Sequence, residues 1–245
     1  MPQPPTGDVT VVHSSDLHVD HDYTARLHDG DGAAGLAAVL QAARDAAADV
    51  VILAGDTFES HRVSPRLIER AAALIEAAAM PVVLLPGNHD PAVADAVYGN
   101  AAMATLANLH ILGIRHDEAV QFPELRLEIW GRAHRDYGDM GPFAGVHPRT
   151  TRWLIAVGHG HYQPLSGSGL QPSWLISDAD IAGTGADYVA LGHWNRAAQV
   201  GNGHVPAYYS GSPEFAGTVN LVRLNEMSGV SVTRAPLAIA RETAG

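Results

Sequence analysis

The stretch Val82-Val83-Leu84-Leu85-Pro86-Gly87-Asn88-His89-Asp90 joins an apolar run to a polar cluster. Four consecutive apolar residues are typical of a strand buried on both faces, as in a parallel sheet. Pro86 and Gly87 then predict a turn. In open α/β sheets, ligands bind at the carboxyl ends of the strands, where we expect Asn88, His89 and Asp90 to lie.

The same pattern of an apolar run and a polar tip occurs before and after this stretch. Residues 9–13 and 50–53 are predicted strands, and alanine-rich residues 33–48 and 64–79 are predicted helices. Ser64 and Pro65 provide an N-cap and a first helical residue. Strands that alternate with helices predict right-handed crossovers and a parallel core. The acidic, polar residues 19–32 are predicted to form a loop.

The second half of the chain is less regular. Short strands are expected at 109–112, 125–130, 153–157 and 187–191, with loops at 131–150 and 163–172. Residues 197–200, 207–209, 220–224 and 230–234 are predicted as antiparallel strands with glycine-bearing turns. Because polar tips occur in both halves, one mixed α/β domain over residues 1–245 is favoured over two domains.

Composition excludes several classes of protein. The 245 residues carry a net charge of −11, which argues against coating nucleic acid or anionic membrane through bulk charge. A local phosphate site remains compatible, because bound cations can supply positive charge. The absence of cysteine excludes disulfides, thiolate metal sites and cysteine nucleophiles. With no signal-like segment at residues 1–7 and no apolar run near ~18 residues, we expect a cytoplasmic protein without a membrane partner.

The polar tips share a set of donors suited to divalent metal ions. They contain Asp16 and His18, Asp56, Asn88 with His89, His159, and His193 with Asn195. Imidazole and oxygen donors favour Mn, Fe, Zn, Co or Ni, and two such ions can share a carboxylate and clamp a phosphate. Strand capping alone is the alternative, since Asx residues often terminate strands. Five such tips, each after an apolar run, favour a site.

With these residues in place, the sequence resembles the calcineurin-like metallophosphoesterase family. The matching segments are Asp16-Leu17-His18, Gly55-Asp56-Thr57-Phe58-Glu59, Gly87-Asn88-His89-Asp90, His159 and Gly192-His193-Trp194-Asn195. The resemblance implies a four-layer α/β/β/α sandwich with two mixed sheets. It also implies two divalent ions, Mn or Fe foremost, bridged by Asp56. Asp16 and His18 would hold the first ion, and Asn88, His159 and His193 the second.

The same resemblance assigns the reaction. A metal-activated hydroxide would attack phosphorus, and His89, oriented by Asp90, would protonate the leaving oxygen. Asn195 replaces the histidine that usually completes the first metal site, so it is expected to act as a weaker, neutral ligand. His159 is favoured over His161 as the ligand because it follows the strand directly. His61, Arg62 and His161 are further candidates for contacts with substrate.

Within the family, the sequence is most similar to a bacterial DNA-repair exonuclease branch that works with an SMC-like ATPase partner. Gly55-Asp56-Thr57-Phe58-Glu59-Ser60, Ala190-Leu191-Gly192-His193 and Tyr208-Tyr209-Ser210-Gly211-Ser212-Pro213 carry this similarity. The sequence stops about where that branch would add a DNA-binding cap and an ATPase-docking tail, so we expect no separate cap domain.

We therefore expect a hydrolase of phosphate esters, first of all phosphodiesters, with a manganese-type dinuclear centre. Two alternatives stay open. One is a nuclease that acts on nucleic acid with an ATPase partner or as a homo-oligomer. The other is a non-catalytic phosphate-binding protein whose first metal site is degraded by Asn195.

Overall fold

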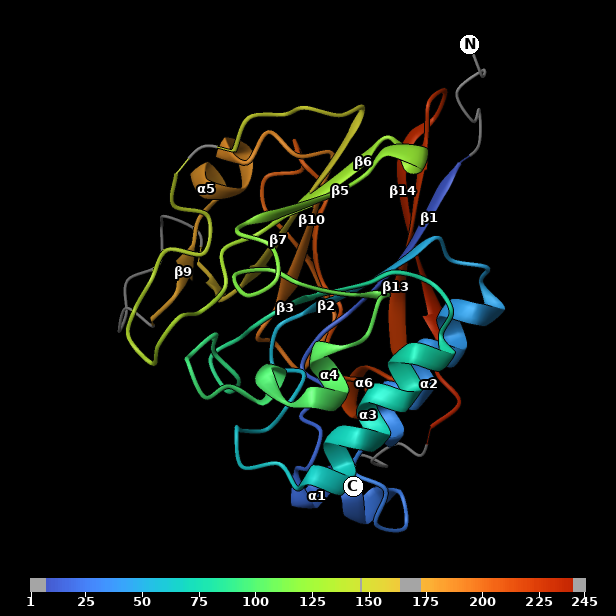
Figure 1. The fold of residues 1–245 in the computed structure, drawn as a ribbon. Helices are drawn as coiled ribbons and strands as arrows, with labels where there is room; N and C mark the ends of the chain where they lie inside the picture. Colours follow the sequence, from blue (N-terminus) through green and yellow to red (C-terminus); the bar gives the residue numbers. More distant parts are fainter. Residues whose placement is uncertain (1–7, 146, 164–172, 240–245) are drawn as a thin grey trace.

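Two six-stranded mixed sheets form the centre of the computed structural model, which describes residues 8–145, 147–163 and 173–239. Figure 1 shows the sheets packed against each other, with most of the helices on one side of the pair. The predicted α/β sandwich with two mixed sheets is confirmed.

The first sheet contains the predicted parallel core. β1, β2, β3 and β4 are parallel neighbours, and β13 and β14 extend the sheet antiparallel beyond β1. Val12 pairs with Val51, and Leu53 pairs with Leu84. The strands, in sheet order, are β14 (Gly229–Pro236), β13 (Thr218–Asn225), β1 (Val9–Ser14), β2 (Val50–Ala54), β3 (Val82–Leu85) and β4 (Leu109–Ile111).

The second sheet repeats this plan with a parallel centre and antiparallel edges. Its parallel strands are β12, β10, β7 and β6, and the edge strands are β11 and β5. In sheet order the strands are β11 (Ala198–Val200), β12 (Ala207–Tyr209), β10 (Tyr188–Gly192), β7 (Trp153–His159), β6 (Leu127–Trp130) and β5 (Ala119–Phe122). A separate small pair joins β8 (His161–Tyr162) and β9 (Leu175–Ile176).

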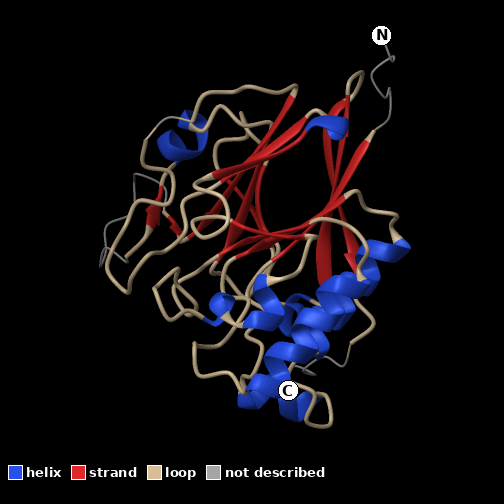
Figure 2. Cartoon of the chain, viewed as in Figure 1, coloured by secondary structure: helices blue, strands red, loops and turns tan. Residues whose placement is uncertain are grey.

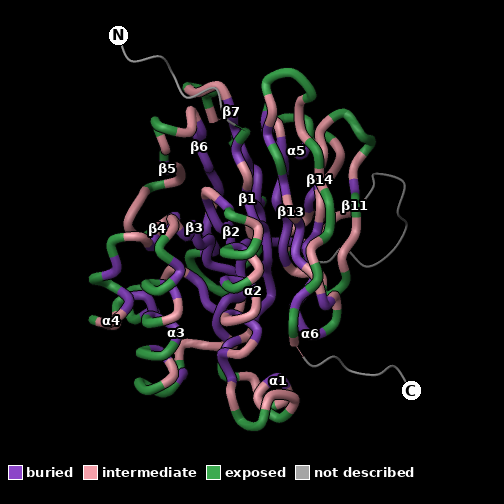
Figure 3. The backbone as a smooth tube through the Cα atoms, turned by 90° about the vertical axis from the view of Figure 1, so that its right-hand side faces the viewer, coloured by how far each residue is buried: buried purple, intermediate pink, exposed green. Residues whose placement is uncertain are grey.

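Three hydrophobic layers hold these elements together. One lies between the first sheet and α2 (Ala34–Asp45), α3 (Pro65–Ala77) and α4 (Ala101–Ala104), a second lies between the sheets, and a third covers the outer face of the second sheet with α5 (Asp178–Gly183) and loops. Figure 2 shows the two sheets in red with the large helices below them. In Figure 3 the central strands are buried along their length, which explains their consecutive apolar residues.

The structure corrects several sequence-based expectations. The predicted loop at 19–32 contains helix α1 (Asp22–Leu27), and the short helix α6 (Pro213–Ala216) was not foreseen. Strand β5 and helix α5 were also missed, as were the two 3₁₀ turns, η1 (Val97–Gly99) and η2 (Pro123–Leu125). β12 pairs antiparallel with β11, as predicted, but parallel with β10. Most of the predicted loop at 163–172 lies outside the described residues. Among the helices described, none is long and apolar enough to cross a membrane.

Candidate metal centre

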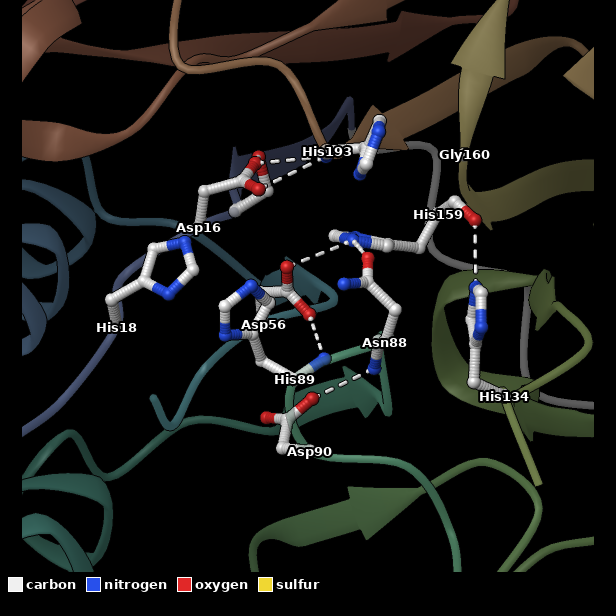
Figure 4. A network of polar contacts seen from close by, with 12 residues as sticks. Asp16, His18, Asp56, Asn88, His89, Asp90, His134, His159, Gly160 and His193 are labelled. Carbon is white, nitrogen blue, oxygen red and sulfur yellow. Dashed lines mark hydrogen bonds and ion pairs between the residues drawn. The ribbon is translucent and has the colours of Figure 1, made fainter. Parts of the chain in front are cut away.

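The parallel strands of both sheets point their carboxyl ends at one place. β1, β2 and β3 deliver Asp16, Asp56 and Asn88 from the first sheet, and β7 and β10 deliver His159 and His193 from the second. Figure 4 shows these side chains facing one another across the seam between the sheets. Residues that lie up to 177 positions apart are in contact, since the backbone N–H of His193 donates to both carboxylate oxygens of Asp16.

Asp56 belongs to two groups of potential metal ligands. Asp16, His18 and Asp56 form one group, and Asp56, His159 and His193 form the other; within each group the ligand atoms lie within 4.8 Å of one another. A carboxylate shared by two such groups is the arrangement expected of a bridging ligand.

The hydrogen bonds of His159 define which nitrogen can bind a cation. Nδ1 lies 2.9 Å from the carbonyl oxygen of Ala54, so Nδ1 carries the proton. Nε2 lies 3.0 Å from Oδ1 of Asn88 and 3.1 Å from Oδ2 of Asp56. If the ring is neutral, Nε2 of His159, Oδ1 of Asn88 and Oδ2 of Asp56 are three acceptor atoms in contact. Such a contact requires a proton or a cation between the atoms. The donor set fits a divalent ion of the Mn, Fe or Zn type.

The titration of these groups reflects the buried charges. Burial lowers the pKa of His159, but the charge and hydrogen bond of Asp56 outweigh this effect and raise it to about 9. Burial likewise raises the pKa of Asp56, but the charge and hydrogen bond of His159 bring it below the usual range. Burial and the charge of His159 lower the pKa of His193 to about 4, so His193 is neutral at pH 7 and can act as a ligand.

Glu59 is a site residue whose role the sequence leaves ambiguous. Its carboxylate accepts a hydrogen bond from Nδ1 of His18 at 2.8 Å, which directs Nε2 of His18 toward the other ligands. The backbone carbonyl of Glu59 accepts from Nδ1 of His89 at 3.1 Å, and its carboxylate lies 3.7 Å from the same nitrogen. Glu59 thereby orients one candidate ligand and the candidate acid together. In the sequence, Glu59 was marked only by its place in the matching segment Gly55-Asp56-Thr57-Phe58-Glu59, which gave it no role.

The structure corrects the role expected of Asp90. Its buried carboxylate accepts hydrogen bonds from the backbone of Phe58 and Gly87 and from the Tyr98 hydroxyl, at 2.6–2.9 Å. These three donors occupy the carboxylate, and Glu59 is the residue that faces the His89 ring. Asp90 instead fixes the loop after β3, and the backbone N–H of His89 donates to Asp56 at 2.9 Å.

Backbone strain is concentrated at the same place. Asp16, His18, Asp56 and His193 have φ angles of 54°, 44°, 51° and 105°, although none is glycine. Each such conformation costs on the order of 1–3 kcal/mol and persists only where the surroundings enforce it. Strain at four of the predicted ligands indicates that the fold holds these side chains in positions that the local chain disfavours.

Two glycines make room for the ligands. A Cβ at Gly87 would lie 2.2 Å from Oδ1 of Asp56, and one at Gly55 would lie 2.1 Å from Nδ1 of His159. Gly55 also has a φ of +88°, a conformation that glycine adopts without steric cost. At Gly87 the close approach of Asp56, rather than a positive φ, requires glycine.

His134 is a site residue that lies in the predicted loop at 131–150 and was not among the candidates. Its side chain is fully buried, and Nε2 donates to the carbonyl oxygen of His159 at 2.9 Å. The backbone of the same residue pairs with Ala92 and Pro86, which holds its loop against the loop after β3. No local pattern marks His134, since its burial depends on contacts between distant loops.

The remaining candidates lie in different places. Asn195 is exposed and lines a cavity of about 640 Å³ together with Asp16, His18 and His89. His161 lies beside the site, with its ring 6.3 Å from that of His193, but outside both ligand groups. His61 and Arg62 line a separate cavity of about 620 Å³, which contains none of the predicted metal ligands.

Comparison with known proteins agrees with this architecture. The family model for calcineurin-like phosphoesterases matches residues 9–197. A putative 5′-nucleotidase from Staphylococcus aureus, solved in complex with alpha-ketoglutarate, is similar with a TM-score of 0.60 and 13% identity over 97% of this chain and 55% of that one. TT1561 of Thermus thermophilus is similar with a TM-score of 0.57 and 14% identity over 93% of this chain and 99% of that one. Among curated proteins, no significant match is found.

Proposed function

The chain belongs to the calcineurin-like phosphoesterase family, a family of metal-dependent hydrolases, and we propose that its own substrates are phosphodiesters, cleaved at a centre of two divalent cations. The observation that carries this proposal is the position of Asp56, whose carboxylate is common to both groups of ligands. Asp16 and His18 would hold one ion with help from Asn195, and Asn88, His159 and His193 would hold the other.

When bound, these ions would supply an activated water as nucleophile and positive charge for the phosphate oxygens. The protein contributes the proton for the leaving group. His89 lines the cavity and is 39% exposed in its side chain, while Glu59 engages Nδ1. Nε2 of a protonated His89 is then the group positioned to donate to the leaving oxygen.

The choice of diester over monoester rests on space around this centre. The cavity beside Asp16, His18 and His89 extends past the ligands to α1 and α6, so a second ester arm of the substrate can be accommodated. The similarity of the sequence to the exonuclease branch supports nucleic acid as one such substrate. The protein would then act together with an ATPase partner. The net charge of −11 favours small phosphodiesters as the primary proposal.

One set of measurements separates these functions. Metal content is determined first, and bis(4-nitrophenyl) phosphate, 4-nitrophenyl phosphate and linear DNA are then tested with added Mn²⁺. We expect about two metal ions per chain and preferential turnover of the diester. Cleavage of DNA ends at comparable efficiency would favour the nuclease. Substoichiometric metal without turnover of any substrate would contradict the proposal and favour a binding protein.

A further inference from the structure

A line of aromatic rings leads away from the candidate metal centre. Starting at His89, the rings of His18, His21, Tyr23 and Phe215 follow at centroid distances of 4.8, 6.4, 6.4 and 6.3 Å. All five residues line the cavity of about 640 Å³. The last two rings are nearly parallel, at 24°. Helices α1 and α6, both absent from the sequence-based prediction, supply Tyr23 and Phe215.

Phe215 lies where this cavity meets another. A second cavity, of about 590 Å³, shares Glu214 and Phe215 with the first and continues to Arg196 and Arg234. Phe215 is 52% exposed, which leaves much of a large apolar ring open to the cavities. Burial raises the pKa of the neighbouring Glu214 to about 7, so the repulsion of an anion by this carboxyl is weakened.

The second cavity concentrates positive charge in an acidic chain. The sequence contains no lysine, so all 15 cationic side chains are arginines, and two of them line this cavity. Arg234 is held in place by Thr218 and by the carbonyl oxygen of Ser210. Within the described part of the chain, no hydrogen bond or ion pair engages the exposed guanidinium of Arg196. An arginine fork of this kind suits a phosphate group.

We propose that these two cavities form one extended substrate site, in which Phe215 stacks on a nucleobase and Arg196 and Arg234 bind a second phosphate. The preferred substrate is then a nucleotide phosphodiester that carries a further phosphate. This inference rests on the proposed phosphodiesterase function, because the scissile phosphate is placed at the metal centre. Nucleobases stack on exposed aromatic rings with little dependence on sequence, so the site selects this chemical class rather than one base.

Three synthetic diesters with the same chromophore test the proposal. They are ethyl 4-nitrophenyl phosphate, thymidine 5′-(4-nitrophenyl phosphate) and the 3′-phosphate of the latter. We expect kcat/KM to rise by about tenfold with the nucleoside and by about tenfold again with the second phosphate. Phe215→Ala should abolish the first increment, and Arg196→Ala the second only. Arg223→Ala, an exposed arginine on β13 outside both cavities, is the matched control and should change neither.

A binding measurement separates failure of this inference from failure of the proposed function. Thymidine 3′,5′-bisphosphate and thymidine 5′-phosphate are titrated calorimetrically against the metal-loaded protein. Arg196→Ala should weaken the bisphosphate about tenfold and leave the monophosphate unchanged. If no diester is hydrolysed, the proposed function is wrong, and the titration still decides whether the subsite exists. Turnover of all three diesters with equal kcat/KM, or equal affinity for both nucleotides, would overturn the inference.

A last comparison identifies the source of the second phosphate. A single-stranded oligonucleotide with the same 5′-(4-nitrophenyl phosphate) end is compared with the nucleoside bisphosphate derivative. A higher kcat/KM for the oligonucleotide would show that a nucleic-acid backbone supplies the second phosphate, whereas equal values would indicate a free nucleotide. In both cases the increment must disappear in Arg196→Ala, and its persistence there would contradict the assignment.

Discussion

Glu59 connects two functions of the site through one side chain and one carbonyl group. Its carboxylate fixes the tautomer of His18, a candidate ligand, and its backbone faces Nδ1 of His89. The two imidazole rings lie 4.8 Å apart at 85°, and His89 lies outside the two ligand groups that share Asp56, although it forms a third group of possible ligands with His18 and Glu59. Substitution of His89 with parallel measurement of rate and metal content separates the role of an acid from that of a ligand.

His89→Ala is expected to lower kcat for a phosphodiester by roughly 10²- to 10⁴-fold, the usual contribution of a positioned general acid. Metal content should remain unchanged, because Asp16, Asp56 and the other predicted ligands stay in place. Steady-state kinetics gives kcat, and metal analysis of the same sample gives the metal content. His204→Ala, at an exposed turn outside the described cavities, is the control. Full activity of His89→Ala would show that another group supplies the proton.

Asn195→His should increase metal affinity at the site formed by Asp16 and His18. A neutral amide oxygen is a weaker ligand than imidazole for Mn, Fe or Zn. Asn195 is exposed in the cavity that these two residues line, so the longer side chain has room to enter it. Metal titration by calorimetry should show the weaker of two affinities improving by about tenfold or more. Unchanged occupancy would show that residue 195 is not a ligand.

The liganding side chains could be predicted because each follows an apolar run, and parallel strands bring their carboxyl ends together. Sequence could not assign Glu59 or His134 in the same way. The hydrogen bond of His134 to His159 depends on a loop docked against the loop after β3, and such long-range contacts leave no local pattern. The expected pairing of Asp90 with His89 was wrong for a related reason, since Phe58 and Tyr98 occupy the carboxylate.

At the scale of elements, the loop after β3 packs closely against the loop after β2 around Asp56. The backbone N–H of His89 and the missing side chain of Gly87 both adjoin the carboxylate of Asp56. The strained φ angles of Asp16, His18 and Asp56 occur in the two neighbouring loops. The strands thus set the distances between ligands, and the strained loops set the orientations.

Gly87→Ala tests this fit. The added Cβ would lie 2.2 Å from Oδ1 and 2.5 Å from the backbone nitrogen of Asp56, so the loops must move apart. We expect a destabilisation of about 1–3 kcal/mol and loss of metal binding. Chemical denaturation and metal analysis provide the two readouts. Gly99→Ala, where nothing lies within 4 Å of the new Cβ, is the control. Normal metal content in Gly87→Ala would contradict the close approach.

The helices that were not predicted from the sequence are short. α1 has six residues and α6 has four, lengths at which isolated helices are not stable and at which apolar periodicity cannot be seen. Their formation depends on packing of Tyr23 against Phe215 and of α6 against α2. The long helices α2 and α3 were predicted because alanine content, an N-cap and Pro65 provide local signals. Phe215 of the extended substrate site lies on α6, so this site could not be predicted from the sequence alone.

At the scale of the whole molecule, the metal centre lies at the seam between the two sheets. Hydrogen bonds cross this seam from His159 of β7 to Ala54 of β2 and from the His193 backbone to Asp16. The ion pair of Asp56 with His159 also joins the sheets. Any change in the charge of His159 is therefore expected to alter the stability of the entire fold. A bound cation that replaces the proton of His159 should likewise change the stability of both sheets.

Without metal, the protein should lose stability as pH rises from about 7.5 to about 9.5. The pKa of His159 is raised to about 9 in the folded state against 6.5 in the unfolded state, so its contribution is fully present below about pH 6.5 and is lost as pH passes through 9. Over this interval the free energy of unfolding should fall by about 2 kcal/mol. Asp56, whose pKa is lowered, affects the pH dependence of stability only in the acid range.

Urea unfolding at several pH values with chelator present measures the slope of stability against pH. His159→Gln should abolish it, and saturating Mn²⁺ should do likewise because the bound ring is neutral. An equal slope in His159→Gln, or increasing stability with pH in the metal-free protein, would show that the imidazolium of His159 does not hold the sheets together.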